Sequence, residues 1–219
     1  MSLLICLALA GSEQLHTMPY REMAQMMGMD DRRRFGKVMF DRLEWRDADA
    51  STYAWDASAW YGGDFNKLWV ETEGEHVDGA THGARLELLW DHIVSPWWST
   101  RLGWRRDFGD GPERGWLAFG VAGITPGLVD LEATAYAGQD GDVAFRLSTD
   151  YDLLLTQRLV LQPQAEANFY SGVTDFEIGL RLRYEFRREI APYLGISWKK
   201  ASGQEPDGTS AVAGIRLWF

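Results

Sequence analysis

Apolar and charged residues alternate along most of this chain, and residues 175–186 have the clearest pattern. This stretch reads DFEIGLRLRYEF, so that every second residue from Phe176 to Phe186 is apolar and the positions between carry charges and a glycine. In an extended strand these two sets point to opposite faces. The charged face is too polar to line an apolar core. The pattern therefore predicts a strand whose apolar face is the outside of the protein, as in the wall of a membrane β-barrel.

The same alternation recurs from Phe35 to the end of the chain and predicts about twelve strands. Their approximate spans are 35–45, 53–62, 65–73, 83–91, 97–106, 115–122, 128–137, 143–153, 158–169, 175–186, 192–199 and 210–219. Such a sheet must close, because unpaired strand edges in hydrocarbon leave backbone groups without hydrogen bonds. We therefore predict an all-β fold, a closed antiparallel transmembrane β-barrel of about twelve strands, with a short N-terminal helical segment.

One strand departs from the pattern, and the connections fall into two groups. Val38 and Phe40 follow one register while Leu43 and Trp45 follow the other, which predicts a β-bulge in the first strand. Alternate connections are short turns, and the others include the longer polar segments RDADAS, GEHVDGATH, DFGDGPER and ASGQEPDGTS. Outer-membrane barrels have short periplasmic turns and longer outer loops. With an even number of strands, both termini are then expected at the periplasmic rim.

Residues 1–11 resemble the remnant of an export signal. Leu3–Ala10 is a short apolar run that ends in Ala8-Leu9-Ala10, like a signal-peptidase site, although no basic segment precedes it. The run is too short to span a bilayer, and the chain has no stretch of about 20 apolar residues that would predict an inner-membrane helix. Cys6, the single cysteine, lies in this run, so we expect a mature protein without thiol chemistry. The predicted organisation is an export remnant at 1–11, a periplasmic segment at 12–34 and a barrel at 35–219.

The segment 12–34, SEQLHTMPYREMAQMMGMDDRRR, is rich in methionine and carries the candidate metal ligands. A short helix is expected over Pro19–Met27, and it would place Met23, Met26 and Met27 on one face. Such a face fits two interpretations: an apolar stripe that packs at the mouth of the barrel, or a soft thioether site for Cu(I). The candidate ligands in this segment are His16, Met18, Met23, Met26, Met27 and Met29.

Three histidines of the barrel are weaker candidates. His92 is expected in a tight turn at the periplasmic rim, as either a further metal ligand or a plain turn residue. His76 and His82 lie in the predicted outer loop GEHVDGATH, where imidazole could bind Cu(II) or simply be solvated. A barrel hydrolase is the least favoured alternative, because neither His82 nor His92 has a serine partner in a suitable register. We therefore do not expect an enzyme.

Composition and charge narrow the function further. The net charge of −10 disfavours nucleic acid as a partner. Many of the 11 Trp, 8 Tyr and 10 Phe lie near the ends of the predicted strands, as in the aromatic girdles of outer-membrane barrels. A soluble sandwich with an aromatic core is disfavoured because it does not need charges on its second face. The chain ends in GIRLWF, an amphipathic strand with a terminal Phe219, and this also favours the outer membrane.

The charged faces of the predicted strands would line the lumen. Eighteen residues are assigned to it: Lys67, Glu71, Glu73, Arg85, Glu87, Asp91, Arg101, Arg105, Asp130, Glu132, Arg146, Asp150, Glu166, Asp175, Glu177, Arg181, Arg183 and Glu185. They fit a ladder of salt bridges that fills a narrow barrel, or a polar path for a cation. Carboxylates bind soft Cu(I) weakly, so these residues are not predicted to form a tight copper site.

Several long stretches resemble the copper resistance protein B family of bacterial outer-membrane proteins. They include FGKVMFDRLEWRDAD, AWDASAWYGGDFNKLWVETEGE, ARLELLWDH, YDLLLTQRLVLQPQAEANFY, DFEIGLRLRYEFRREIAPYLGISW and VAGIRLWF. The resemblance covers about Met29 to Phe219. It implies a barrel that binds or passes copper, and members commonly carry Met- and His-rich segments before the barrel. Here that segment is short and has one histidine, His16.

Taken with the resemblance, the sequence predicts an outer-membrane copper-binding protein of copper resistance and homeostasis. It would bind periplasmic copper, with Cu(I) favoured, through the Met/His segment and pass it across the outer membrane. The expected partners are copper ions, outer-membrane lipid and a periplasmic copper carrier or oxidase, with no nucleic acid. The alternative is a passive outer-membrane pore or a structural barrel without specific metal binding.

Overall fold

The protein divides into two compact units, Met1–Phe35 and Gly36–Phe219. The computed structural model describes residues 26–27, 33–47, 51–77, 79–109, 113–139, 141–170, 173–201 and 208–219. In the first unit Met26 is helical and Met27 follows in a turn, while the rest of the predicted helix Pro19–Met27 lies outside the described residues. Within the described part of the chain, no helix has the length and apolar character needed to cross a membrane.

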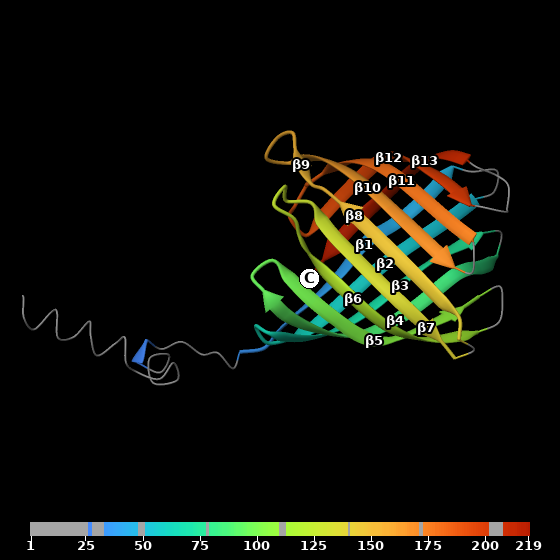
Figure 1. Cartoon of the computed structure of the whole chain (residues 1–219). Coiled ribbons are helices and arrows are strands. Elements are labelled where there is room, and N and C mark those ends of the chain that lie inside the picture. The colour runs from blue at the N-terminus through green and yellow to red at the C-terminus, as the bar shows by residue number, and fades with distance from the viewer. Residues whose placement is uncertain are drawn as a thin grey trace, which may run out of the picture. The chain divides into compact units, whose positions relative to one another are not determined.

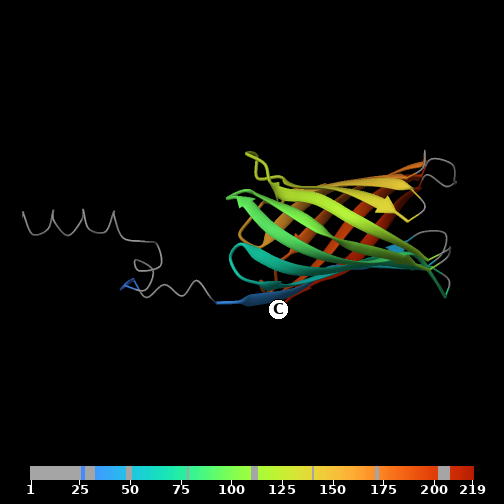
Figure 2. The same cartoon turned by 60° about the horizontal axis from the view of Figure 1, so that its bottom comes forward.

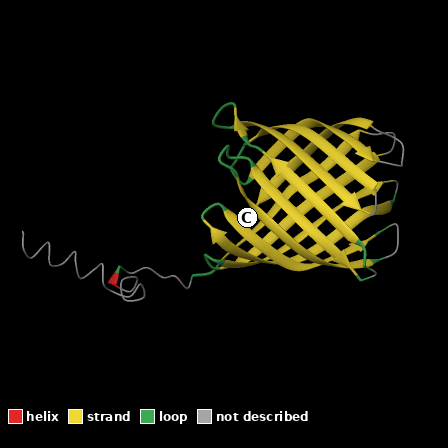
Figure 3. Cartoon of the chain, in the orientation of Figure 1, coloured by secondary structure: helices red, strands yellow, loops and turns green. Residues whose placement is uncertain are grey.

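The second unit is a single antiparallel sheet that closes on itself (Figures 1 and 2). Its strands are β1 (Phe35–Asp47), β2 (Ser51–Gly62), β3 (Asn66–Val77), β4 (Ala80–Ser95), β5 (Trp98–Phe108), β6 (Arg114–Ile124), β7 (Asp130–Gly138), β8 (Val143–Asp150), β9 (Leu153–Leu154), β10 (Leu159–Tyr170), β11 (Val173–Tyr184), β12 (Ile190–Ala201) and β13 (Gly208–Trp218). β8 and the short β9 both pair with β10, so together they occupy one position in the wall. The barrel therefore has twelve strand positions, as predicted, and Figure 3 shows that its wall is almost entirely strand.

Two pairings close the barrel. β10 pairs with β11 from Leu159↔Tyr184 to Tyr170↔Val173, and β1 pairs with β13 from Met39↔Trp218 to Asp47↔Ala211. The β1–β13 register shifts between Phe40 and Leu43, which confirms the predicted bulge. Val38 and Phe219 exchange two backbone hydrogen bonds, so the last residue of the chain is fixed to the first strand.

The predicted difference in loop length between the two rims is wrong. The connection 109–113 is matched in length by the connection 185–189 at the rim that holds Phe219. The predicted loop GEHVDGATH is mostly strand, because β3 continues to Val77 and β4 begins at Ala80. His76 and His82 consequently lie in paired strands, opposite Thr81 and Glu75. The orientation of the barrel in the membrane stays a prediction.

The two faces of the wall have the predicted polarity, which is the reverse of a soluble protein. On β4, Leu88 is 45% exposed on the outside, while its neighbour Glu87 is 2% exposed inside the barrel. The same holds on β11, where Leu182 is 42% exposed and Arg183 is 3% exposed. Apolar outer walls with charged interiors are what a hydrocarbon environment requires. The second unit is thus a transmembrane barrel whose lumen is lined by charged side chains.

Candidate functional site

Three glutamates of β3 organise the charged lumen. Glu71, Glu73 and Glu75 follow at every second position, so all three point inward, roughly 7 Å apart along the strand. Each accepts hydrogen bonds from a different set of arginine or lysine side chains on other strands. The lumen is therefore crossed by three successive layers of ion pairs, which we name after these glutamates.

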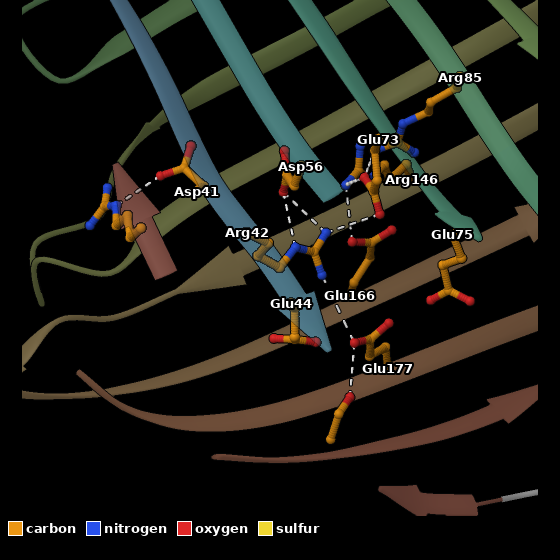
Figure 4. Close-up of polar contacts among 12 residues, drawn as sticks. Asp41, Arg42, Glu44, Asp56, Glu73, Glu75, Arg85, Arg146, Glu166 and Glu177 are labelled. Atoms are coloured by element: carbon orange, nitrogen blue, oxygen red, sulfur yellow. Dashed lines mark hydrogen bonds and ion pairs between the residues drawn. The ribbon is translucent and has the colours of Figure 1, made fainter. Parts of the chain in front are cut away.

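The Glu73 layer consists of Arg42, Glu73, Arg85, Arg146 and Glu166 (Figure 4). Glu73 accepts from Arg42 Nη2 at 3.0 Å, from Arg146 Nη2 at 3.0 Å and from Arg85. Arg146 also donates to Glu166 at 3.0 Å. β10, which carries Glu166, lies directly across the barrel from β3, with five strands between them on each side. The Glu73–Arg146–Glu166 contacts therefore span the full width of the lumen.

The Glu75 layer joins β3 to the opposite side of the wall and consists of Glu44, Arg46, Glu75, Glu177 and Lys199. Arg46 donates to Glu44 at 2.8 Å, to Glu75 at 2.9 Å and to Glu177 at 2.9 Å. Lys199 contacts both Glu75 and Glu177. One guanidinium on β1 thus holds carboxylates from β1, β3 and β11 together, and this planar, multiply bonded geometry is typical of arginine.

Glu44 is the most deeply buried carboxylate of this layer, with a side chain that is 0% exposed. Besides Arg46, it accepts a hydrogen bond from Arg181 Nε at 2.8 Å and one from the Tyr193 hydroxyl at 3.1 Å. Gly214 on the neighbouring strand leaves room for this tyrosine, because a Cβ there would lie 2.5 Å from the hydroxyl oxygen. Glu44 therefore ties β11 and β12 to β1 from inside the barrel.

The Glu71 layer consists of Glu71, Asp91, Arg101 and Glu132. Arg101 donates to Glu71 at 3.1 Å, to Glu132 at 2.8 Å and to Asp91 at 3.2 Å. Its guanidinium also lies over the Trp69 ring, 4.7 Å from the ring centre. This layer connects β3, β4, β5 and β7, and it covers the part of the lumen that the Glu75 layer does not reach.

An aromatic cluster fills the β4–β7 side of the interior. It is made of the buried residues Leu89, Trp116, Ala118 and Tyr136, with Trp69, Ala144 and Tyr170 packed against them. Two of its polar atoms are bonded to lumen carboxylates, since Tyr136 donates to Glu87 at 3.0 Å and Trp116 donates to Asp107 at 2.8 Å. The interior thus contains a small packed core as well as ion pairs.

Two separate cavities remain in the lumen. One of about 380 Å³ is lined by Met39, Asp41, Asp130 and Asp150 among others, and one of about 930 Å³ is lined by His82, Arg114, Lys199 and Lys200 among others. Glu73 and Glu166 line both cavities. Two residues of the Glu73 layer therefore lie where the two cavities meet.

The sequence matches the family Copper resistance protein B precursor (CopB) over residues 34–219. The chain belongs to the copper resistance protein B family. Copper resistance protein B of Escherichia coli is 41% identical over 203 residues, which cover 83% of this chain and 69% of that protein. A copper resistance protein B homolog of Pseudomonas syringae pv. tomato is 44% identical over 200 residues, covering 82% and 68% respectively. Membership of the copper resistance protein B family supports a role in copper resistance.

Solved structures agree with the fold of this copper resistance protein B family barrel. The KdgM porin has a TM-score of 0.56 at 14% identity, and the NanC porin has a TM-score of 0.57 at 12% identity. Each comparison covers 84% of this chain and 99% of the porin. Together with the apolar outer wall and the family, this fold places the chain in the outer membrane.

The predicted copper ligands of this family member lie mainly outside the described residues. His16, Met18, Met23 and Met29 are among the residues that the structure does not describe, while Met26 and Met27 are 67% and 52% exposed. Within the described ranges, no group of three or more His, Cys, Asp or Glu residues is arranged to hold a metal ion. Copper binding by the Met/His segment therefore stays a prediction.

The predicted turn position of His92 is wrong. β4 continues to Ser95, and His92 is paired with Asn66 and Thr100 inside the sheet. Its Nδ1 lies 3.0 Å from the Asn66 side-chain oxygen, and its ring lies 5.7 Å from that of Trp90, which is exposed on the outer face. The side chain of His92 thus belongs to the outer surface near the rim. Its role as a metal ligand stays a prediction, and the described residues place no second metal ligand beside it.

Sequence reasoning missed the charged residues of β1. Arg42, Glu44 and Arg46 are buried, and they connect the Glu73 and Glu75 layers. The bulge between Phe40 and Leu43 changes the face of the residues that follow, so a single alternation across β1 could not assign them. The sequence does contain a signal for this arrangement. If the alternation of faces is counted again from Leu43, then Arg42, Glu44 and Arg46 all point into the barrel. The predicted salt-bridge ladder is confirmed for most of the lumen residues named from the sequence.

Proposed function

We propose that this chain binds periplasmic copper as Cu(I) through the segment 12–34, which precedes an outer-membrane barrel, and so contributes to copper resistance. The observation that carries the proposal is the grouping of Met23, Met26 and Met27 at i, i+3 and i+4 in a member of a copper resistance family. Thioether sulfur binds Cu(I) in preference to hard ions. The exposure of Met26 and Met27 is consistent with side chains that are available to a metal.

The ligands that the barrel offers also favour the segment 12–34 as the site of soft copper. The described lumen offers mainly carboxylates, which are hard ligands, and most of them are already bonded to arginine. His16 and the methionines at positions 18 and 29 would add an imidazole and further thioethers on either side of the predicted helix. A periplasmic copper carrier or oxidase would be the source or recipient of the ion. Passage of copper across the outer membrane would be a further step.

A titration of Cu(I) against the full-length protein in detergent tests the proposal. The test variant carries Met23→Leu, Met26→Leu and Met27→Leu, because leucine keeps the apolar volume and helix propensity and removes only the sulfur. We expect its affinity for Cu(I) to fall by about tenfold or more, equivalent to at least ~1.4 kcal/mol. The matched control is Met39→Leu in β1, which removes a thioether from the barrel and leaves the segment intact. Equal affinity of the triple variant and the wild type would reject the assignment.

A further inference from the structure

We infer that the lumen of this barrel is closed by its ion pairs, so that the protein is not a passive pore. The inference does not depend on copper binding. It rests on the three layers of ion pairs, on the burial of their arginines and on the two separate cavities.

The layers together cover the cross-section of the lumen. The Glu73 layer runs from β3 straight across to β10, the Glu71 layer runs from β3 to β7, and the Glu75 layer runs from β3 to β11 and β12. All three start on the same strand and reach different parts of the opposite wall. The aromatic cluster occupies much of the space next to β4–β7. Every part of the lumen cross-section is therefore crossed by contacts among several side chains.

The burial of the guanidinium groups distinguishes this interior from a water-filled channel. The side chains of Arg42, Arg46, Arg85, Arg101 and Arg146 are 9%, 5%, 10%, 9% and 13% exposed. Arginines that project from the wall of an open pore would keep most of their surface in water. Here each is enclosed by carboxylates from at least two strand positions. An ion that moved from one cavity to the other would have to displace the Glu73 layer.

Closure limits how the barrel can act on copper. A cation in the smaller cavity meets Arg42, Arg85, Arg146 and Arg181, all of which line it, before it reaches the larger cavity. Three of these arginines, Arg42, Arg85 and Arg146, are bonded to Glu73, and moving them requires several charge-assisted hydrogen bonds to break together. The barrel in this conformation therefore keeps the two sides of the membrane separate.

Ion conductance of the full-length protein in planar lipid bilayers tests the inference. The wild type is expected to give no steady conductance in potassium chloride, whereas a porin reconstituted in parallel does. Heat-modifiable mobility on gels, measured on the same protein preparation, establishes that the barrel is folded. Steady single-channel conductance of the folded wild type would overturn the inference without any variant.

The double variant Glu73→Ala, Arg146→Ala is designed to open the lumen while it keeps the net charge. The groups left behind retain partners, because Arg42 bonds to Asp56, Arg85 lies 3.5 Å from Glu87, and Glu166 accepts from Asn168. We expect steady conductance from this variant. The control is Arg106→Ala, Glu113→Ala, which removes an exposed pair, with side chains 51% and 61% exposed, and is expected to stay silent. A folded double variant as silent as the control would show that the Glu73 layer does not close the barrel.

Discussion

Replacement of Glu44 by alanine tests how much the buried ion pairs stabilise the barrel. The side chain of Glu44 is fully buried, and it accepts hydrogen bonds from Arg46, Arg181 and Tyr193. Arg46 keeps Glu75 and Glu177 as partners after the change. Arg181 does not, because within the described residues its Nη1 and Nη2 have no hydrogen-bond partner and its Nε is bonded to Glu44. The substitution therefore leaves one guanidinium buried without a carboxylate.

We expect Glu44→Ala to lower the free energy of unfolding by about 3–5 kcal/mol, the usual cost of removing one partner of a buried ion pair. The loss comes mainly from Arg181, which is 2% exposed and cannot reach water without a change in the wall. Urea unfolding of the barrel in lipid vesicles, followed by tryptophan fluorescence and by heat-modifiable mobility, measures it. The fluorescence reports on the barrel, because ten of the 11 tryptophans lie in its strands.

Two further variants separate this explanation from a general effect of mutation. Glu113→Ala removes a carboxylate from an exposed pair with Arg106 and is expected to cost about 0–1 kcal/mol. Glu44→Ala combined with Arg181→Met removes both charges, so it should be less destabilised than Glu44→Ala alone. A value for Glu44→Ala within about 1 kcal/mol of the wild type would refute the reasoning, because it would mean that the orphaned guanidinium finds solvent or a new partner.

Three other substitutions probe the wall by the same unfolding assay. Gly214→Ala should lower the free energy of unfolding by about 1–3 kcal/mol, because its Cβ would lie 2.5 Å from the Tyr193 hydroxyl oxygen and 2.7 Å from a backbone oxygen. An unchanged urea midpoint would mean that the tyrosine moves freely. Ile196→Lys, on the outer face in the middle of β12, should lower the free energy of unfolding by about 2–4 kcal/mol, whereas Ile190→Lys at the end of the strand should lower it by about 0–1 kcal/mol. Equal losses would contradict the lipid-facing assignment. Leu128→Gly should stabilise by up to about 1 kcal/mol, because Leu128 has a φ of 60° in the β6–β7 turn; a loss of stability would show that its side chain makes a needed contact.

The wall of the barrel could be predicted from sequence because it depends on a local pattern. Alternation at every second residue identifies a strand and both of its faces, as for Leu88 and Glu87, without knowledge of the rest of the fold. The pattern fails where glycines allow an unusual backbone. Gly79 and Gly83, with φ of 89° and 56°, suggest a loop in the sequence. Instead, Val77 pairs with Ala80 in a tight hairpin at Gly79 and Gly83 lies within β4, so His82 was assigned to a loop that does not exist.

The pairing of charges inside the barrel could not be predicted in the same way. Which side chains meet depends on the register of all strand pairs and on which strands lie opposite each other after closure. The sequence assigned Glu73 and Arg146 to the lumen. Nothing in the sequence around either residue indicates that these two side chains, 73 positions apart, lie 3.0 Å from each other. The candidate copper ligands raise a different difficulty, because their assignment rests on side-chain chemistry and family rather than on a fixed arrangement of strands.

The long sequence separations within the ion-pair layers have a consequence for biogenesis. Arg46 and Glu177 are 131 residues apart, and Arg181 and Glu44 are 137 residues apart. β1 can complete the pairing of its buried charges only after β11 has been added, because among the described residues Arg181 has no carboxylate but Glu44 and Arg46 also bonds to Glu177, so a partly assembled wall would expose incompletely paired charges. Insertion is therefore expected to be all-or-none. A nascent chain that lacks its final strands is expected to form no metastable intermediate within the membrane.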